Sequence, residues 1–151
     1  MEKVVEISEF QDVFYLDKTL IMDNRPVVIF DDYKLDYPKI NYDNLLSRMI
    51  DVFNQALKLS KLKNFNDFAI ICYLNPNRKN SVNIKSVCQI VTILKSLFKN
   101  VIYECDFINY NKFFKLAFGI IQPLLDPSLR KRLKFKKIID LRGRLINLKE
   151  C

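Results

Sequence analysis

The sequence predicts an α/β domain in which a mostly parallel β-sheet is flanked by helices. Strand-like and helix-like segments alternate along the chain, and the helical segments are long enough to connect parallel strands as crossovers. Two runs of consecutive apolar residues, 26–30 and 68–74, are typical of buried strands. A length of 151 residues suits one domain with its own core. We therefore expect a single compact domain over residues 1–151.

The first half of the chain combines short strands with one long helix. Asp17 and Lys18 separate two short apolar pieces, and Asp23-Asn24 predicts a turn before the stronger strand. Asn41 is a suitable N-cap for the helix that follows. The expected strands are 13–16, 20–22 and 26–30, and the expected helix, from its apolar period, is 42–59.

The second half continues the alternation to the end of the chain. Ser81 is a candidate cap for one helix, and Asn109 or Asn111 opens another. Asp126 followed by Pro127 predicts the start of a further short helix. The expected strands are 68–74, 101–103 and 133–139, and the expected helices are 81–98, 113–125, a short one from 127, and 141–148.

Missing residue types exclude several kinds of catalytic site. The chain contains no histidine, so Ser-His and Cys-His nucleophile pairs and histidine metal sites are absent. Its only two glycines are Gly119 and Gly143, so no glycine-rich loop can hold a nucleotide phosphate. We therefore expect a protein that is not an enzyme, with no cofactor, no metal and no catalytic residue.

Two groups of carboxylates remain as candidates for chemistry. Asp31, Asp32 and Asp36 follow the first strong strand, where an open α/β sheet usually places its ligand site. Glu104 and Asp106 are two residues apart and share a face if the strand continues through them. Such groups bind Mg²⁺ or transfer protons in some proteins. The simpler interpretation is that they are polar loop residues or partners of helix ends, and they make no case for an enzyme.

Cysteine usage and hydropathy indicate the compartment. Cys72, Cys88, Cys105 and Cys151 have no C-x-x-C spacing, and the N-terminus shows no signal-peptide pattern. No apolar run approaches the roughly 20 residues that span a bilayer. We expect reduced thiols and a soluble cytoplasmic protein that also contacts membranes peripherally.

Charge is distributed unevenly between the two parts of the chain. Residues 1–60 carry 7 basic and 11 acidic side chains, whereas residues 61–151 carry 18 and 6. The net charges are therefore −4 and +12. The second part is suited to an anionic partner, unless the basic residues form a merely solvated surface. We do not expect nucleic acid, because the aromatic residues lie on apolar stripes instead of alternating with Lys and Arg.

The segment 113–125 is apolar around most of the helix. Only Lys112, Lys115 and Gln122 interrupt it, and Pro123 predicts a kink or an early end. Such a helix is either deeply buried or covers something apolar. A basic run follows it, which is the combination that contact with anionic lipid requires. The candidate membrane-contact residues are Arg130, Lys131, Arg132, Lys134, Lys136 and Lys137.

Three segments resemble the CRAL-TRIO domain family, and in particular its divergent branch that includes BCH domains. Residues 23–30 are similar to the family's turn, Arg-Pro and apolar strand, and residues 67–79 to the strand and basic loop of that branch. The most specific segment is 113–135, FFKLAFGIIQPLLDPSLRKRLKF, which resembles the family's gate helix and the basic lead into the next strand. The resemblance covers about residues 11–148.

This resemblance implies a sheet that forms the floor of a pocket for one lipid or similar apolar molecule, with a hinged gate helix above it. Lipid exchange at an anionic membrane would then be the function. The head-group residues of the phosphatidylinositol-transfer members have no match here, and Glu104-Cys105-Asp106 stands where the BCH branch usually carries a histidine. The implied gate and pocket residues are Phe113, Phe114, Ala117, Phe118, Ile121 and Leu125.

The same resemblance implies an alternative function. BCH domains are protein-interaction modules, so the partner would be a small GTPase or another regulatory protein. Arg78 and Lys79, in the loop after the second buried strand, would form the contact, unless they belong to a solvated turn.

Overall fold

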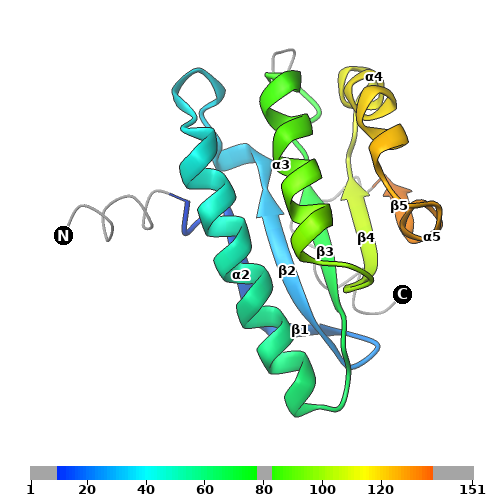
Figure 1. Ribbon diagram of the computed structural model, residues 1–151. Coiled ribbons are helices and arrows are strands. Elements are labelled where there is room, and N and C mark those ends of the chain that lie inside the picture. The colour runs from blue at the N-terminus through cyan, green and yellow to red at the C-terminus, as the bar shows by residue number, and fades with distance from the viewer. Residues whose placement is uncertain (1–9, 78–82, 138–151) are drawn as a thin grey trace.

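The computed structural model describes residues 10–77 and 83–137, which form a five-stranded sheet and its helices (Figure 1). The strand order is β1-β2-β3-β4-β5. The first pair is antiparallel and the other three pairs are parallel. The predicted α/β class with a mostly parallel sheet is confirmed. The strands are β1 (Phe14–Met22), β2 (Arg25–Asp31), β3 (Phe68–Tyr73), β4 (Ile102–Ile108) and β5 (Leu133–Lys136).

The β1–β2 hairpin differs from the prediction in one respect. The two apolar pieces around Asp17 belong to one strand, and the pairing register shifts between Asp17 and Ile21. The Asp17 carboxylate accepts a hydrogen bond of 2.8 Å from the backbone N–H of Thr19, so the irregularity is satisfied locally. The turn residues Asp23 and Asn24 have φ values of 48° and 70°. Asp and Asn tolerate this left-handed region, which a tight hairpin turn requires.

Side-chain caps define where the long helices begin. Asn41 accepts from the backbone N–H of Asn44 at 3.1 Å, so the predicted cap of α2 (Tyr42–Leu62) is confirmed. The cap of α3 (Ile84–Leu97) is Asn83, which accepts from Ser86, so the assignment of the cap to Ser81 was wrong. Ser81 itself lies outside the described residues.

The α-helix of the apolar segment ends early, as Pro123 predicted, so it is shorter than residues 113–125. Asn111 caps α4 (Lys112–Ile121), and its side chain accepts from Phe114 at 2.9 Å. The α-helix ends before Pro123, and the chain continues as the 3-10 turn η3 (Gln122–Leu124). The short helix α5 (Pro127–Arg130) begins at the predicted proline. The expected helix 141–148 lies outside the described residues.

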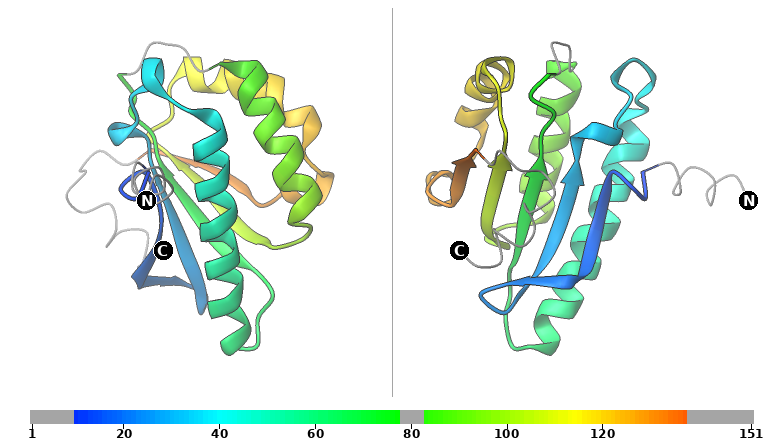
Figure 2. Two further views of the ribbon diagram at one scale, coloured as in Figure 1. Left: turned by 60° about the vertical axis from the view of Figure 1, so that its left-hand side comes forward. Right: turned by 180° about the vertical axis from the view of Figure 1, so that it is seen from behind.

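All three long helices lie on one face of the sheet (Figure 2). The parallel strands follow one another in a single direction, and crossovers of one hand then place every connecting helix on the same side. The core of this face joins Val28, Ile70 and Cys105 of the sheet to Val52 and Phe53 of α2. The helices α2, α3 and α4 therefore lie side by side over one surface of the sheet.

The opposite face of the sheet is also apolar in its centre. Val27, Ile29, Ala69 and Ile71 are at most 2% exposed on this side. Asp106 pairs with Ile71 in the ladder and shares this face. The sheet therefore separates a helix-covered apolar surface from a second surface that carries buried charge.

Aromatic residues hold one guanidinium at the amino end of the parallel strands. The guanidinium of Arg25 stacks on the rings of Phe65 and Tyr103, at 4.2 and 4.1 Å from their centroids. Its Nε also donates to Asp67 at 2.9 Å. This group ties the hairpin to the loop before β3. Among the described residues, no helix is long and apolar enough to cross a membrane.

Candidate functional site

Two apolar cavities lie between the sheet and the helices that cover it. Cavity I, of about 330 Å³, extends from the sheet floor to α3, α4 and α5. Cavity II, of about 540 Å³, lies nearer the carboxyl ends of the strands and is bounded by the start of α2, by α3 and by α4. The two cavities adjoin, because they share the lining residues Phe30, Met49, Val87, Val91, Leu94, Phe114, Phe118 and Ile121.

Helix α4 covers this space without being buried itself. None of its residues is buried, although eight of its ten residues are not charged and most are large and apolar. Phe113, Leu116 and Ile120 line cavity II and yet are 45%, 70% and 58% exposed. Cavity II therefore reaches the surface beside α4, and an apolar stripe of the helix faces outward.

The structure brings the six predicted gate residues to this space. Phe114, Phe118 and Ile121 line both cavities. Phe113 and Ala117 line cavity II alone, and Leu125 lines cavity I alone. Helical spacing explains the division, because residues 114, 118 and 121 recur on the face of α4 that points to the sheet.

Tilted and edge-to-face aromatic ring pairs hold α4 above β4 and β5. The ring of Phe107 lies 5.0 Å from Phe114 and 5.5 Å from Phe118, between centroids. Phe135 of β5 is 5.4 Å from Phe118 and 5.3 Å from Phe107. Such ring pairs contribute about 0.5–1.5 kcal/mol each beyond their area. The contacts of α4 with the sheet are therefore side-chain contacts that do not involve backbone pairing.

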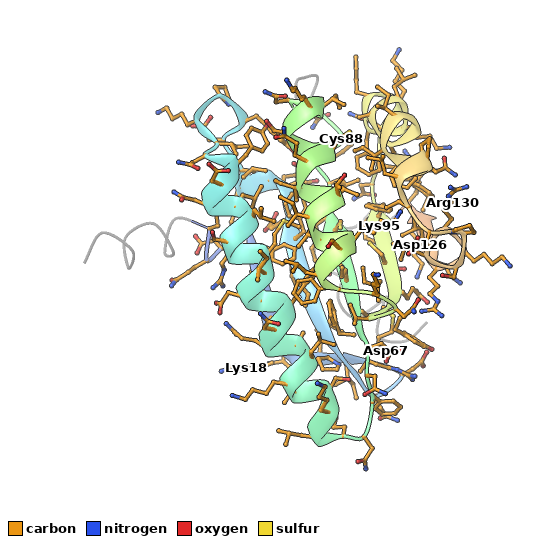
Figure 3. All side chains as sticks on the ribbon, viewed as in Figure 1. Lys18, Asp67, Cys88, Lys95, Asp126 and Arg130 are labelled. Atoms are coloured by element: carbon orange, nitrogen blue, oxygen red, sulfur yellow. The ribbon has the colours of Figure 1, made fainter. Side chains whose placement is uncertain are left out.

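A polar tether joins α3 to the chain beyond α4. The ammonium of Lys95 donates to the carbonyl of Leu124 at 2.9 Å and lies 3.5 Å from the Asp126 carboxylate. Figure 3 shows Lys95 and Asp126 next to one another, between α3 and the start of α5. Arg130 donates two hydrogen bonds to the Leu125 carbonyl. Both side chains of the Lys95–Asp126 pair are about half exposed, so the pair is weak and easily broken.

A buried carboxylate marks the polar end of cavity II. Asp32 is 3% exposed and accepts from the Tyr37 hydroxyl and from the backbone N–H of Asn75 at 2.9 Å. Sequence reasoning noted this residue as part of a cluster with Asp31 and Asp36, but treated a structural role as the simpler explanation. The structure gives Asp31 such a role, since its side chain accepts from Tyr33 at the start of η1 (Asp32–Lys34). Asp32 and Tyr37, in contrast, line the cavity.

The predicted basic run does not form one uniform surface. Arg132 donates to the Ile102 carbonyl at 2.9 Å, and Lys137 donates to the Tyr110 carbonyl at 2.7 Å. Lys136 and Arg130 likewise have partners within the fold. Of the six, only Lys131 and Lys134 have no hydrogen-bond or ion-pair partner among the described residues, and both are exposed.

Arg130, Arg132, Lys136 and Lys137 therefore have structural roles around α5 and β5 in addition to their charge. Arg78 and Lys79, predicted as a protein contact, lie outside the described residues.

The predicted pair of carboxylates shares a face of β4, as its spacing indicated. Burial raises the pKa of Glu104 to about 7, and a hydrogen bond with Asp106 and its charge act in the same direction. The ammonium of Lys136 is 3.0 Å from Asp106 and 3.8 Å from Glu104 and partly offsets this effect. Asp106 is fully buried, and its Oδ1 has no hydrogen-bond partner among the described groups. No cluster that could hold a metal ion occurs among the described residues.

Two thiols form part of the floor of cavity I. Cys72 and Cys105 lie on neighbouring strands and face the helices. A hydrogen bond with Cys72 and burial raise the pKa of the Cys105 thiol well above its ordinary value. Neutral, buried thiols of this kind behave as small apolar groups. Cys88, by comparison, is half-buried on α3 and lines neither cavity.

Sequence reasoning missed the contribution of α2 and α3 to the cavity walls. Val87, Val91 and Leu94 of α3 were recognised as an apolar stripe, and Met49 of α2 as part of another. A stripe that packs against a core and a stripe that lines a cavity have the same sequence pattern. The spacing between neighbouring elements, which the sequence does not show, decides between them.

Fold and site together define an α/β domain with one helical layer and an apolar cavity beneath a partly exposed helix. A family model for the CRAL/TRIO domain matches residues 14–145, so the chain belongs to the CRAL/TRIO domain family. Membership supports lipid binding or transfer in general, and proteins of this family are generally non-enzymatic. No curated protein matches the chain in sequence.

The chain is similar in structure to Sfh5, whose crystal structure superposes with a TM-score of 0.74. The sequences are 19% identical, and the match covers 95% of this chain. It covers 53% of the Sfh5 chain, so the present chain spans about half the length of that relative. This likeness concerns the fold alone.

Proposed function

We propose that this protein binds one lipid between the sheet and α4, without catalysis, and exchanges it with a membrane. The observation that carries the proposal is the pair of adjoining apolar cavities, of about 330 and 540 Å³, beneath a helix with no buried residue. Ligand pockets in proteins have volumes of about 300–1,000 Å³ and mostly apolar walls. Apolar walls next to water are costly, and an apolar ligand removes that cost.

The free energy of apolar burial favours a role for α4 as a movable cover of the cavities over a role as a core helix. A helix that served as core would bury its large side chains at about 25 cal/mol per Å² of apolar area. In α4, Phe113, Leu116 and Ile120 instead remain exposed. A lipid in the cavity contributes about 0.8 kcal/mol for each buried methylene, which compensates for this incomplete burial. We therefore assign the role of gate to Phe114, Ala117, Phe118 and Ile121, together with Phe113 and Leu125.

Filling the space between the two cavities should prevent lipid binding without unfolding the protein. Val91 lines both cavities, so Val91→Phe places a ring where they adjoin. Ile93, on the same helix, lines neither cavity and is 40% exposed, so Ile93→Phe is the matched control. We expect native mass spectrometry of freshly purified protein to detect one bound lipid in the wild type and in Ile93→Phe, and none in Val91→Phe. Equal thermal stability of the two variants would exclude misfolding as the reason.

The proposal fails if the wild-type protein purifies without any lipid and takes none up from vesicles. It also fails if Val91→Phe, folded, retains the same lipid occupancy as Ile93→Phe.

Peripheral membrane contact is the second part of the proposed function. Leu116 and Ile120 are the most exposed large apolar residues of α4, and Lys112 adjoins Leu116 on the helical surface. Exposed Lys131 and Lys134 add positive charge beyond α5. An apolar stripe beside basic residues binds anionic interfaces, with on the order of 1 kcal/mol from each basic side chain near the surface.

Vesicle binding tests this contact. We expect co-sedimentation with phosphatidylserine-containing vesicles that weakens as salt rises from 50 to about 300 mM, because screening acts on exposed charges. The double change Leu116→Glu and Ile120→Glu should reduce binding about tenfold or more. Leu62→Glu, at the 79% exposed end of α2, is the control and should bind like the wild type. Equal binding by all three proteins would contradict the assignment of this face.

The alternative function, a BCH-type interaction with a small GTPase, depends on Arg78 and Lys79. No described contact favours it. A protein that carries no lipid but captures a GTPase, and loses it on Arg78→Glu and Lys79→Glu, would replace the lipid proposal with this one.

A further inference from the structure

We infer that Glu104 is a proton-operated switch that couples the edge strand β5 to the helix α4. When Glu104 is ionised, its carboxylate attracts Lys136 of β5. When it is protonated, it donates to Asp106 on its own strand and the attraction to β5 is lost. The part of the inference that concerns lipid release rests on the proposed function. Three observations carry it: the two partners of Glu104, the alternation of side chains along β5, and the ring contacts between β5 and α4.

Glu104 lies between a basic and an acidic partner on the face of the sheet away from the helices. The ammonium of Lys136 is 3.8 Å from its carboxylate and 3.0 Å from that of Asp106. Asp106 is fully buried, and its Oδ1 has no hydrogen-bond partner among the described groups. An ionised carboxylate only accepts hydrogen bonds, whereas a protonated one carries an O–H donor. A proton on Glu104 therefore replaces a partner on β5 by a buried acceptor on β4.

The charge of Glu104 changes near neutral pH. Burial, followed by the hydrogen bond with Asp106, raises its pKa to about 7. The charged groups of β4 and β5 that act on it are Asp106, Lys134 and Lys136. The ionisable rings on or beside this face are Tyr15 of β1, Tyr73 of β3 and Tyr103 of β4. Lysine and tyrosine side chains ordinarily ionise near pH 10, so a change between about pH 6 and pH 8 reports on a carboxyl group of raised pKa.

Alternation along β5 connects this cluster to the opposite face of the sheet. Among the described strands, β5 lies at the edge, consists of four residues and pairs with β4. Phe135 and Lys136 are consecutive, so their side chains point to opposite faces. A change in the attraction between Lys136 and β4 therefore acts on the position of Phe135 as well.

Phe135 forms part of the contact between the sheet and α4. Its ring centroid is 5.4 Å from that of Phe118 and 6.4 Å from that of Phe114. The ammonium of Lys115, also on α4, lies 5.8 Å from the centroid of the same ring. Because α4 has no buried residue, its position depends on such side-chain contacts. We therefore expect α4 to move away from the sheet more readily when Glu104 is protonated.

Protonation has opposite effects on the whole fold and on β5. The fold gains stability, because two neighbouring carboxylates no longer repel each other. The edge strand loses one of the two attractions on Lys136. The side chains of Lys136 and Glu104 are 32% and 20% exposed, so salt screens their attraction less than that of a fully exposed pair. An anionic membrane surface at about −30 mV attracts protons and lowers the local pH by about half a unit, so the switch favours opening at the membrane.

Fluorine NMR tests the switch on the full chain without any lipid. The probe is para-fluorophenylalanine in place of Phe135, and the control is the same probe in place of Phe53, which is 3% exposed in the core beneath α2. We expect the fluorine shift at position 135 to titrate with a midpoint near pH 7 and the shift at position 53 to stay constant. Glu104→Gln should abolish the titration. Asp12→Asn, which removes one exposed carboxylate elsewhere, should leave it unchanged.

Lipid transfer tests the coupling to α4. The measurement uses a fluorescent lipid and phosphatidylcholine vesicles, which carry no net charge, so that bulk pH is the variable. We expect wild-type transfer to be at least about threefold faster at pH 6 than at pH 8. Glu104→Gln should transfer at the fast rate at both pH values. Because this variant is expected to be at least as stable as the wild type, unfolding would not explain its faster transfer.

The two measurements separate the possible failures. A constant fluorine shift at position 135 in the wild type would overturn the inference, and so would a titration that persists in Glu104→Gln. A titration without a change in transfer rate, or with slower transfer at pH 6, would overturn the coupling to α4. If the wild type transfers no lipid at any pH, the proposed function fails, and the fluorine titration still decides whether Glu104 controls β5.

Discussion

Glu104 shows how burial changes the properties of a single side chain. Its carboxylate lies beside that of Asp106 on the face of the sheet away from the helices. Sequence spacing predicted that the two share a face. It did not predict Lys136, which reaches both carboxylates from a strand 30 residues later. Contacts between distant residues depend on strand order, which the local sequence does not encode.

Glu104→Gln should stabilise the protein at alkaline pH. Because the pKa of Glu104 is raised from 4.5 to about 7, the folded state keeps its proton over a range where the unfolded chain has lost it. The contribution of this group to stability is therefore complete below about pH 4.5 and is lost as the pH rises through 7. Its side chain is 20% exposed, and screening by solvent reduces the effect, so we expect a gain of about 1 kcal/mol at pH 8.

Urea unfolding at pH 5 and pH 8 measures this difference. The variant and the wild type should differ more at pH 8 than at pH 5. Asp12→Asn, at an exposed position, is the control and should leave the difference between the two pH values unchanged. A gain from Glu104→Gln that is equal at both pH values would show that charge is not its cause.

At the scale of single elements, caps and turns were predictable, but element lengths were less so. Asn41 and the Asp126-Pro127 start depend on neighbouring residues only, and both were predicted, whereas Asn111 was one of two candidates, with Asn109, for the start of α4. The strand around 101–103 extends through Ile108 because β3 and β5 pair with it on either side. Polar residues such as Glu104 hide that extension, since they look like the end of a strand when no partner is known.

Gly119→Ala should stabilise α4 and slow lipid exchange. A Cβ at Gly119 would meet no atom within 4 Å, so the glycine is not required for packing. Replacing a helical glycine by alanine contributes about 0.4–1 kcal/mol, largely by restricting the unfolded chain. A stiffer gate opens less often, so we expect a several-fold slower transfer of a fluorescent lipid between vesicles.

Ser96→Ala on the exposed side of α3 is the matched control for that experiment. It raises helix propensity in a neighbouring element and should leave the transfer rate unchanged. If both variants slowed lipid transfer equally, the overall stability of the protein would set the transfer rate, and the stiffness of α4 would not.

At the scale of the whole molecule, the site exists because sheet and helices are separated by a layer that their side chains do not fill. Cys72 and Cys105 lie at the bottom of this layer, and α3 and α4 lie above it. Neither thiol is accessible to solvent unless α4 moves away from the sheet or a small molecule enters cavity I. The reactivity of these two cysteines can therefore report whether cavity I is occupied, without any introduced label site.

Bound lipid should protect these thiols selectively. In a Cys151→Ser background, N-ethylmaleimide at pH 8 should label Cys88 first, because it is less buried and the raised pKa of Cys105 keeps that thiol protonated. Lipid should slow the labelling of Cys72 and Cys105 about tenfold and leave Cys88 unchanged. Peptide mass spectrometry over time gives the three rates. Equal slowing at all three positions would indicate global stabilisation and not occupancy of cavity I.

The sequence alone determined the alternation of strands and helices, the apolar character of residues 113–125 and the absence of histidine and glycine-rich chemistry. These follow from the local order of residues, through periodicity, caps and residue types. Tertiary structure alone decided that α4 stays unburied, that Asp32 faces the larger cavity and that several basic residues serve as internal partners. Those properties depend on how closely elements from different parts of the chain approach one another in space. An apolar surface becomes core where its neighbour packs against it, and it becomes a cavity wall where the neighbour stands further away.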